Sequence, residues 1–285
     1  MKIVPSGQIS ATQFGLAPFD LAQPVSVDQA MAAVDDCDGT AVFLAGGTDL
    51  FLQFRDGLQP DCIIDLNGIS EIRDIAINDD VLSIGAGSRH QFGIANSDVL
   101  SRLPGLSEAW ALLGNVRVRG MGTLGGNLMA RNGRYEGPLF AAALDARLRF
   151  QGPAGNFLHS VDNVWRGDID TNLLLTHIEI PLAASPVFAC DRSLRPIMTI
   201  AVAIESSPEG GIRGRAVIGT EWDLPVTLEL QLGAGISLNE FAANAPDIAG
   251  ATMDTLPQTM KDADYLTVAG TAILTRLIKR LVAAS

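Results

Sequence analysis

Two short glycine-rich segments carry the residue types and spacing that suit a phosphorylated ligand. One is Leu-Ala-Gly-Gly-Thr-Asp-Leu at 44–50, and the other is Gly-Thr-Leu-Gly-Gly-Asn-Leu at 122–128. A pyrophosphate is held by several backbone N–H groups at close range, which a Cβ atom would obstruct. A helix N-terminus adds favourable partial charge, and Thr or Asn adds hydrogen bonds. A single Gly-Gly pair is more often a tight turn, but two such loops favour a dinucleotide site.

Gly120, Gly122 and Gly125 also satisfy the GxGxxG pattern. In a nicotinamide-binding Rossmann unit, this pattern follows a strand and opens a helix. Here the preceding segment, 108–113, has a helical pattern, and the following segment, 129–138, contains glycines and a proline typical of a loop. The sequence therefore argues against a Rossmann fold.

The cysteine and histidine spacing argues against several kinds of site. Cys37, Cys62 and Cys190 lie far apart with no CxxC pair, whereas an iron–sulfur cluster usually needs about four grouped thiolates. This odd, sparse set also predicts no disulfide framework and hence a reducing compartment. The histidines form neither HxxxH nor HExxH, so we expect no zinc site.

The composition is that of an apolar, acidic chain. Of its 285 residues, 47% are hydrophobic and 18% charged, and the formal net charge is −12. Such a chain can bury a core, and it lacks the clustered Lys and Arg of a nucleic-acid-binding surface. No signal peptide is predicted, and no apolar run reaches the roughly 18 residues of a membrane span. Residues 266–284 carry three basic side chains and indicate an amphipathic helix. We therefore expect a cytoplasmic protein.

The elements around the first loop form a compact strand–helix–strand unit. The predicted order is a helix over 26–34, a strand over 40–45, a helix from Asp49 to Gly57, and a strand over 62–66. Ser26 followed by Gln29 is a capping-box pattern for the first helix. The two strands are separated by a helix, so parallel pairing is expected.

The pattern changes near residues 165–172. Before it, we predict strands over 81–84 and 147–150, the second at a sheet edge, and helices over 106–113 and 139–146. After it, we predict longer antiparallel strands over 173–180, 197–205 and 212–219, then helices over 237–244 and 263–283. These patterns predict an α/β domain over 1–170, beginning with an irregular stretch over 1–18, and an α+β domain over 171–285.

The order of these segments resembles the FAD-binding medium subunit of molybdenum hydroxylases. That family includes xanthine dehydrogenase-like and aerobic carbon monoxide dehydrogenase-like enzymes. The matching segments are Pro24–Ala30, Leu44–Leu50, Ile63–Leu66, Leu82–Ala86, Val116–Arg117, Gly122–Leu128, Ala142–Ala146, Leu175–Pro181, Ile200–Ile204 and Asp262–Val282. The resemblance covers nearly the whole chain from about residue 18.

The resemblance implies an α+β fold. A two-part FAD-binding domain of the molybdenum-hydroxylase/vanillyl-alcohol-oxidase type, with two α/β subdomains, precedes a C-terminal antiparallel sheet with helices. It also implies that the FAD pyrophosphate lies between the loops, against Ala45, Gly46, Gly47, Thr48, Asp49, Thr123, Leu124, Gly125, Gly126 and Asn127. Glu136 matches an acidic position that holds the adenosine ribose. Leu113 and Leu175 match apolar positions near the flavin, although ordinary core packing explains such residues equally well.

Residues 131–136, Arg-Asn-Gly-Arg-Tyr-Glu, depart from the small-residue stretch usual in the family. Two interpretations stay open: a solvated loop, or a contact with FAD phosphates or a partner subunit. Some relatives stack a tyrosine on the flavin, but this chain offers only Tyr135 and Tyr265. The sequence does not place such a residue.

The function implied by the resemblance is electron transfer. A large partner subunit would carry the molybdenum cofactor, and a small partner would carry two [2Fe-2S] clusters that pass electrons to FAD here. The flavin would then reduce an external acceptor, within a dimer of heterotrimers. Two alternatives remain: a self-sufficient flavin oxidoreductase of the same fold, and a non-catalytic scaffold that has lost FAD. The missing substrate-binding domain argues against the first, and the two intact loops argue against the second.

Overall fold

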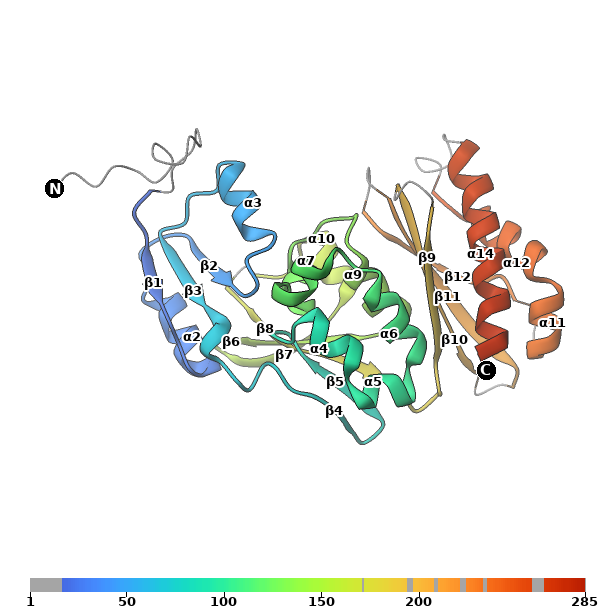
Figure 1. Cartoon of the computed structure of the whole chain (residues 1–285), viewed down its shortest axis with the longest axis horizontal. Coiled ribbons are helices and arrows are strands. Elements are labelled where there is room, and N and C mark those ends of the chain that lie inside the picture. The colour runs from blue at the N-terminus through green and yellow to red at the C-terminus, as the bar shows by residue number, and fades with distance from the viewer. Residues whose placement is uncertain are drawn as a thin grey trace.

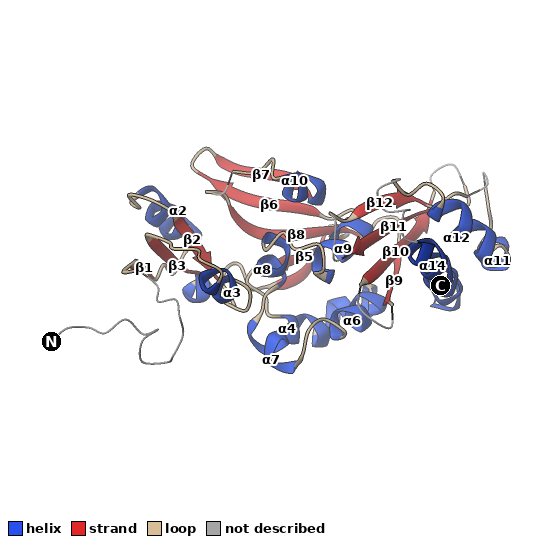
Figure 2. Cartoon of the chain, turned by 90° about the horizontal axis from the view of Figure 1, so that it is seen from above, coloured by secondary structure: helices blue, strands red, loops and turns tan. Residues whose placement is uncertain are grey.

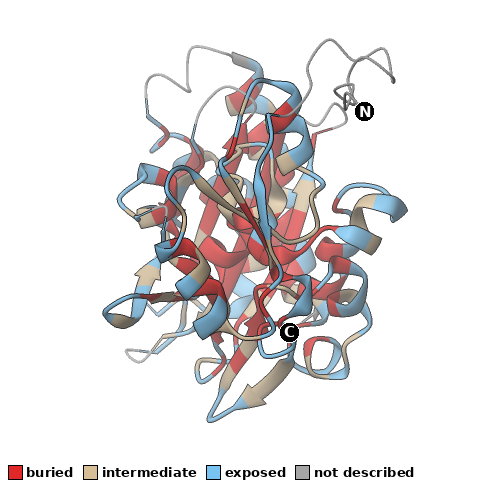
Figure 3. Cartoon of the chain, turned by 90° about the vertical axis from the view of Figure 1, so that its left-hand side faces the viewer, coloured by how far each residue is buried: buried red, intermediate tan, exposed pale blue. Residues whose placement is uncertain are grey.

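The computed structural model of the protein describes residues 17–170, 172–193, 197–207, 210–220, 224–232, 235–257 and 264–284. Three β-sheets follow one another along the long axis, with β1 (Asp20–Ala22) and α14 (Asp264–Ala284) at opposite ends (Figure 1). Viewed along that axis, buried positions gather in the interior and exposed ones on the surrounding helices and loops (Figure 3). Apart from residues 17 and 18, the irregular stretch predicted for residues 1–18 lies outside the described residues.

The first unit is a parallel three-stranded sheet in the order β1-β3-β2. Its further elements are α2 (Val27–Asp35), β2 (Ala41–Leu44), α3 (Leu50–Arg55), β3 (Cys62–Asp65) and the 3-10 helix η1 (Leu66–Gly68). The Ser26 hydroxyl accepts the Gln29 N–H and caps α2, as predicted. The expected parallel pairing of β2 with β3 is confirmed. The first glycine loop therefore emerges from the carboxyl end of β2.

Cys37 and Cys62 form a disulfide bond, with their Cα atoms 6.2 Å apart at a sequence separation of 25. The expectation of no disulfide is wrong, and the cysteines therefore no longer indicate a reducing compartment. The two cysteines lie far apart along the chain, so their spacing gives no sign that they pair. Cys37 follows α2 and Cys62 opens β3, and α2 packs beside β3. The bond closes a ring that contains β2, the first loop and α3.

The second unit is a five-stranded antiparallel sheet in the order β4-β5-β8-β6-β7. Its elements are β4 (Ile75–Asn78), β5 (Val81–Gly85), α4 (His90–Ala95), α5 (Ser97–Arg102), α6 (Pro104–Ala111), α7 (Val116–Met121), α8 (Leu124–Met129), α9 (Glu136–Ala143), β6 (Arg147–Gly152), β7 (Gly155–Ser160), α10 (Val161–Arg166) and β8 (Leu174–Pro181). Leu82 and Ile84 of the sheet share a core with Trp110 and Leu139 of the helices. These short helices carry the second glycine loop.

Strand β8 follows the predicted domain boundary at residue 170 but occupies the middle of this sheet, between β5 and β6. A division at residue 170 would remove the hydrogen-bonding partner of both neighbours. We therefore propose that the N-terminal domain extends through β8. The edge position predicted for 147–150 is wrong, because β6 pairs on both sides, and β7 forms the edge.

The third unit is an antiparallel sheet in the order β12-β11-β10-β9, covered on one face by helices (Figure 2). Its elements are β9 (Val187–Arg192), β10 (Met198–Ser206), β11 (Ile212–Thr220), β12 (Val226–Glu229), α11 (Leu238–Ala243), α12 (Ala245–Met253) and α14. Ile200 and Val202 of β10 face these helices, whereas Ala201 and Ala203 join the core of the second unit. A strand buried on both faces explains the continuous apolar run. Among the described helices, none has the length and apolarity of a membrane span.

Candidate cofactor site

A cavity of about 790 Å³ lies where the first unit meets the helices of the second. Both glycine loops contribute to its wall, together with the α6–α7 turn, the start of β8 and the end of β9. Cavities of several hundred Å³ are typical of cofactor sites. Twelve of the thirteen residues proposed from the sequence line it, namely Ala45, Gly46, Gly47, Thr48, Asp49, Leu113, Thr123, Gly125, Gly126, Asn127, Glu136 and Leu175. The thirteenth, Leu124, packs its side chain in the core instead.

The first loop supplies backbone donors. In the described part of the chain, no protein atom accepts the N–H groups of the four consecutive residues from Gly47 to Leu50. The loop is held against the second unit at Gly46, where an added Cβ would lie 2.2 Å from the Met121 carbonyl oxygen. Only glycine allows this approach. Four free donors on a fixed backbone suit an oxygen-rich anion such as a pyrophosphate.

The second loop is built differently, because most of its N–H groups are already used. The Thr123 hydroxyl accepts the Gly126 N–H at 3.0 Å and caps α8. The N–H groups of Leu124 and Gly125 donate to carbonyl groups of the segment before α4. What this loop offers is space: an added Cβ at Gly126 would meet only the Thr123 hydroxyl within 4 Å. The open side of Gly126 faces the cavity that it lines.

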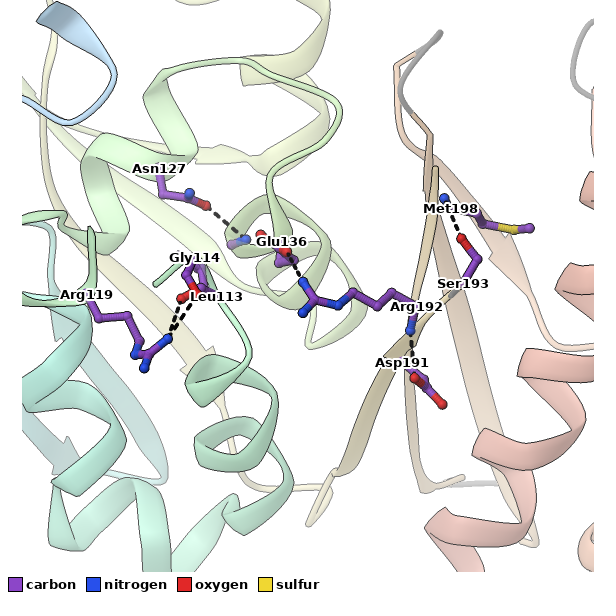
Figure 4. A network of polar contacts seen from close by, with 10 residues as sticks. Leu113, Gly114, Arg119, Asn127, Glu136, Asp191, Arg192, Ser193 and Met198 are labelled. Carbon is purple, nitrogen blue, oxygen red and sulfur yellow. Dashed lines mark hydrogen bonds and ion pairs between the residues drawn. The ribbon is translucent and has the colours of Figure 1, made fainter. Parts of the chain in front are cut away.

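Asn127 adds one oriented side chain to this wall. Its Oδ1 accepts the Gly137 N–H at 2.9 Å at the start of α9 (Figure 4). This contact fixes the amide, so that Nδ2 is left as a hydrogen-bond donor.

Glu136 begins α9 and lies within 3.6 Å of Arg192 at the end of β9 (Figure 4). Burial raises the pKa of the Glu136 carboxyl, and the Arg192 guanidinium acts in the opposite direction. Both residues line the cavity. Arg192 could not be identified from the sequence, since no local pattern indicates a contact between the second and third units.

His90 is a second cavity residue that no sequence pattern indicates. It is 1% exposed, lines the cavity, and accepts the Trp110 indole N–H at Nδ1 over 2.8 Å. Burial first, and then the charge of Arg119, lowers the pKa of His90 to about 4. The neutral ring therefore carries its proton on Nε2, which donates to no atom of the described residues. His90 thus presents one donor at the cavity wall.

The apolar lining residues come from two separate elements. Leu113 is 2% exposed in the α6–α7 turn, and Leu175 is 4% exposed on β8. Arg119 holds the turn by donating to the carbonyl groups of Leu113 and Gly114 over 3.1 and 3.0 Å (Figure 4). A fixed apolar surface of this kind suits a planar ring.

The segment 131–136 forms part of the cavity wall. Arg131, Arg134 and Tyr135 all line the cavity, although both arginines are also exposed to solvent. The Tyr135 hydroxyl donates to Oδ1 of Asp49 at 2.5 Å, across 86 residues of sequence. The departure from the family pattern therefore reaches the cofactor cavity and joins it to the first loop.

These features fit FAD. The cavity offers free N–H groups for a pyrophosphate, an open glycine surface opposite them, polar side chains at Asn127 and Glu136, and apolar walls at Leu113 and Leu175. Within the described residues, no cluster of three or more His, Cys, Asp or Glu side chains could hold a metal ion.

Comparisons with known proteins agree with this geometry. The sequence family described as the FAD binding domain in molybdopterin dehydrogenase matches residues 17–183. The carbon monoxide dehydrogenase medium chain of Hydrogenophaga pseudoflava is 27% identical over 284 residues, which cover 94% of this chain and 96% of that one. The glyceraldehyde dehydrogenase medium chain of Sulfolobus acidocaldarius is 30% identical over 170 residues, covering 58% of this chain and 60% of its own length.

Comparison with solved structures identifies the same fold. Carbon monoxide dehydrogenase from Hydrogenophaga pseudoflava superposes with a TM-score of 0.77 at 25% identity, covering 99% of both chains. Quinoline 2-oxidoreductase from Pseudomonas putida 86 shares the fold, with a TM-score of 0.79 at 24% identity, covering 95% of this chain and 99% of that one. The α+β fold expected from the resemblance is confirmed. The chain belongs to the FAD-binding family of the molybdopterin dehydrogenases, whose members include the medium chains of these multi-subunit oxidoreductases.

Proposed function

We propose that this chain binds FAD between its two glycine loops and passes electrons through it. The observation that carries the proposal is the meeting of both loops at one cavity, with free N–H groups on one side and the open face of Gly126 on the other. Residues 45–49 and 123–127 are assigned to the pyrophosphate, with Leu124 supporting the loop from the core.

Three further roles belong to the proposal. Glu136 accepts hydrogen bonds from the adenosine ribose, supported by its place on the cavity wall. Leu113 and Leu175 contact the flavin ring, supported by their burial at the same cavity. FAD, when bound, supplies reversible redox chemistry, and these residues supply binding and orientation.

The partners are also proposed. The relatives are medium chains by name, which points to an assembly with other chains. We assign the molybdenum cofactor to a large subunit and two [2Fe-2S] clusters to a small one, in a dimer of heterotrimers that reduces an external acceptor. A cytoplasmic location stays part of the proposal, supported by the acidic composition alone now that the disulfide removes the cysteine argument.

The test is the absorption spectrum of the protein purified with its native partners, followed by chromatography of the released cofactor. We expect flavin bands, about one FAD per chain, and iron–sulfur absorbance from the companions. FAD without companions would favour a self-sufficient flavin oxidoreductase. No flavin, even after FAD is added, would favour a non-catalytic scaffold.

A further inference from the structure

The hydrogen bond between Tyr135 and Asp49 connects two parts of the cavity wall that belong to different units. Asp49 lies in the first glycine loop, and Tyr135 lies in the segment between the second loop and α9. Both residues line the cavity. Elsewhere the same loop touches the second unit through the backbone, at Gly46 against Met121. The first loop is thus tied to the opposite wall at two points, one made of backbone and one of side chains.

The two ties differ in how easily they can open. The Gly46 contact is a close backbone approach, so separating it requires a shift of the loop itself. The Tyr135–Asp49 contact breaks by rotation of two side chains, without movement of the backbone. Tyr135 and Asp49 are both half-buried. The side-chain tie is therefore the part of the wall that can act as a gate.

The side chain of Asp49 is positioned for this contact, and only its backbone N–H is left for a phosphate. Its Oδ2 accepts the Gln53 side-chain N–H at 2.6 Å, and its Oδ1 accepts the Tyr135 hydroxyl. Both oxygens of the carboxylate therefore have donors, and its negative charge would repel a pyrophosphate. Burial, and then the hydrogen bond to Asp49, raise the pKa of the Tyr135 phenol, so the donor stays protonated at physiological pH.

We propose that the Tyr135–Asp49 hydrogen bond is a latch that closes the cavity over FAD and must open whenever the cofactor enters or leaves. This inference rests on the proposed function, because it concerns the same cavity. It gives the unusual segment 131–136 a specific task, which is control of the rate of cofactor exchange. Tyr135 is accordingly a positioning residue and takes no part in the redox chemistry of the flavin.

The test is Tyr135→Phe in the full chain, which removes only the hydroxyl. FAD binding and release are followed by stopped-flow flavin fluorescence. Since the latch must open in both directions, the association and dissociation rates should each rise about tenfold, the worth of one hydrogen bond to a charged group. The equilibrium affinity should stay within about threefold. Tyr265→Phe is the matched control, because Tyr265 lies half exposed on α14, outside the cavity.

A double variant separates the latch from a merely structural role. Tyr135→Phe added to Asp49→Ala should leave the FAD exchange rates of Asp49→Ala unchanged, because one contact can be lost only once. Faster release with slower binding would indicate a distorted loop and would overturn the latch, as would unchanged rates. Failure of the wild-type chain itself to bind FAD would instead overturn the proposed function, and the latch with it.

Discussion

Among single residues, Gly126 gives the most direct test of the cofactor site. Its Cβ position meets only the Thr123 hydroxyl, at 3.0 Å, so a larger side chain can extend into the cavity without disturbing the core. Gly126→Val should fold but bind FAD at least 10- to 100-fold more weakly, roughly the effect of overpacking. Gly250→Val on α12 is the matched control, because an added Cβ there meets nothing within 4 Å. Fluorescence titration showing equal affinity in the two variants would reject the role of the second loop.

His90 predicts a specific pH dependence of stability. Its pKa is lowered to about 4 in the folded state, against about 6.5 in the unfolded state. The unfolded chain therefore binds the extra proton first, and the stability present above pH 6.5 is lost as the pH falls towards 4, by roughly 3 kcal/mol. His90→Asn keeps an acceptor for Trp110 and should lack this loss. Urea unfolding between pH 4 and 7 measures this loss of stability, with His159→Asn as the control.

The difference between the wild-type and His90→Asn curves isolates this group from His177, whose pKa is also lowered by burial. Identical curves would show that His90 is not the buried neutral group described above. Protonation would charge a ring that is 1% exposed, and it would break the hydrogen bond from Trp110. His90 should for the same reason remain a neutral donor throughout the physiological range.

At the scale of single residues, the sequence could predict only features that depend on neighbouring positions in the chain. The glycine loops were recognisable because paired glycines and neighbouring polar side chains are adjacent along the chain. Of the site residues proposed from the two loops, all but Leu124 line the cavity. His90, Arg192 and the contact of Tyr135 with Asp49 were not recognisable, since each depends on packing between distant segments. The inward direction of Leu124 also depends on where α8 packs, which the loop motif does not encode.

At the scale of the elements, the disulfide should stabilise the first unit. Cys37 and Cys62 close a ring at a sequence separation of 25, and this ring contains the first glycine loop. The chain-entropy argument for a ring of that size gives a stabilisation of about 3.5 kcal/mol. Replacing both cysteines with serine should lower the free energy of unfolding by about that amount. Urea unfolding with and without reductant measures it, and reductant should leave the serine variant unchanged. Free thiols at both positions in the native protein would contradict the bond.

The helices and strands were predictable where periodicity and capping are strong. The Ser26 cap, the parallel β2–β3 pair and the strands β10 and β11 follow directly from sequence patterns. Strand order was not predictable, because the same apolar run suits an edge or a central position once both faces are covered. This ambiguity misplaced 147–150 at an edge.

Across the whole molecule, the second and third units share a continuous hydrophobic core. Phe140 of α9 meets Phe188 of β9 edge to face, with ring centroids 5.5 Å apart, and Ala201 and Ala203 extend the same core. Arg276 pairs with Asp191 within the third unit, and Arg192 crosses to Glu136 in the second. A large apolar interface of this kind argues against hinge motion between the units. We therefore expect a cofactor to enter and leave on the side of the cavity where the first unit meets the second.

The central position of β8 also affects how this chain folds during its synthesis. About ninety residues separate β5 from its partner β8. At about 5 to 20 residues per second, a ribosome needs roughly 5 to 20 s to synthesise them. Throughout that interval the nascent sheet has an open edge at β5, which makes it vulnerable to wrong pairing and a natural client for chaperones. Arg192 at the end of β9 also lines the cavity, so the cavity wall is complete only after β9 has been synthesised.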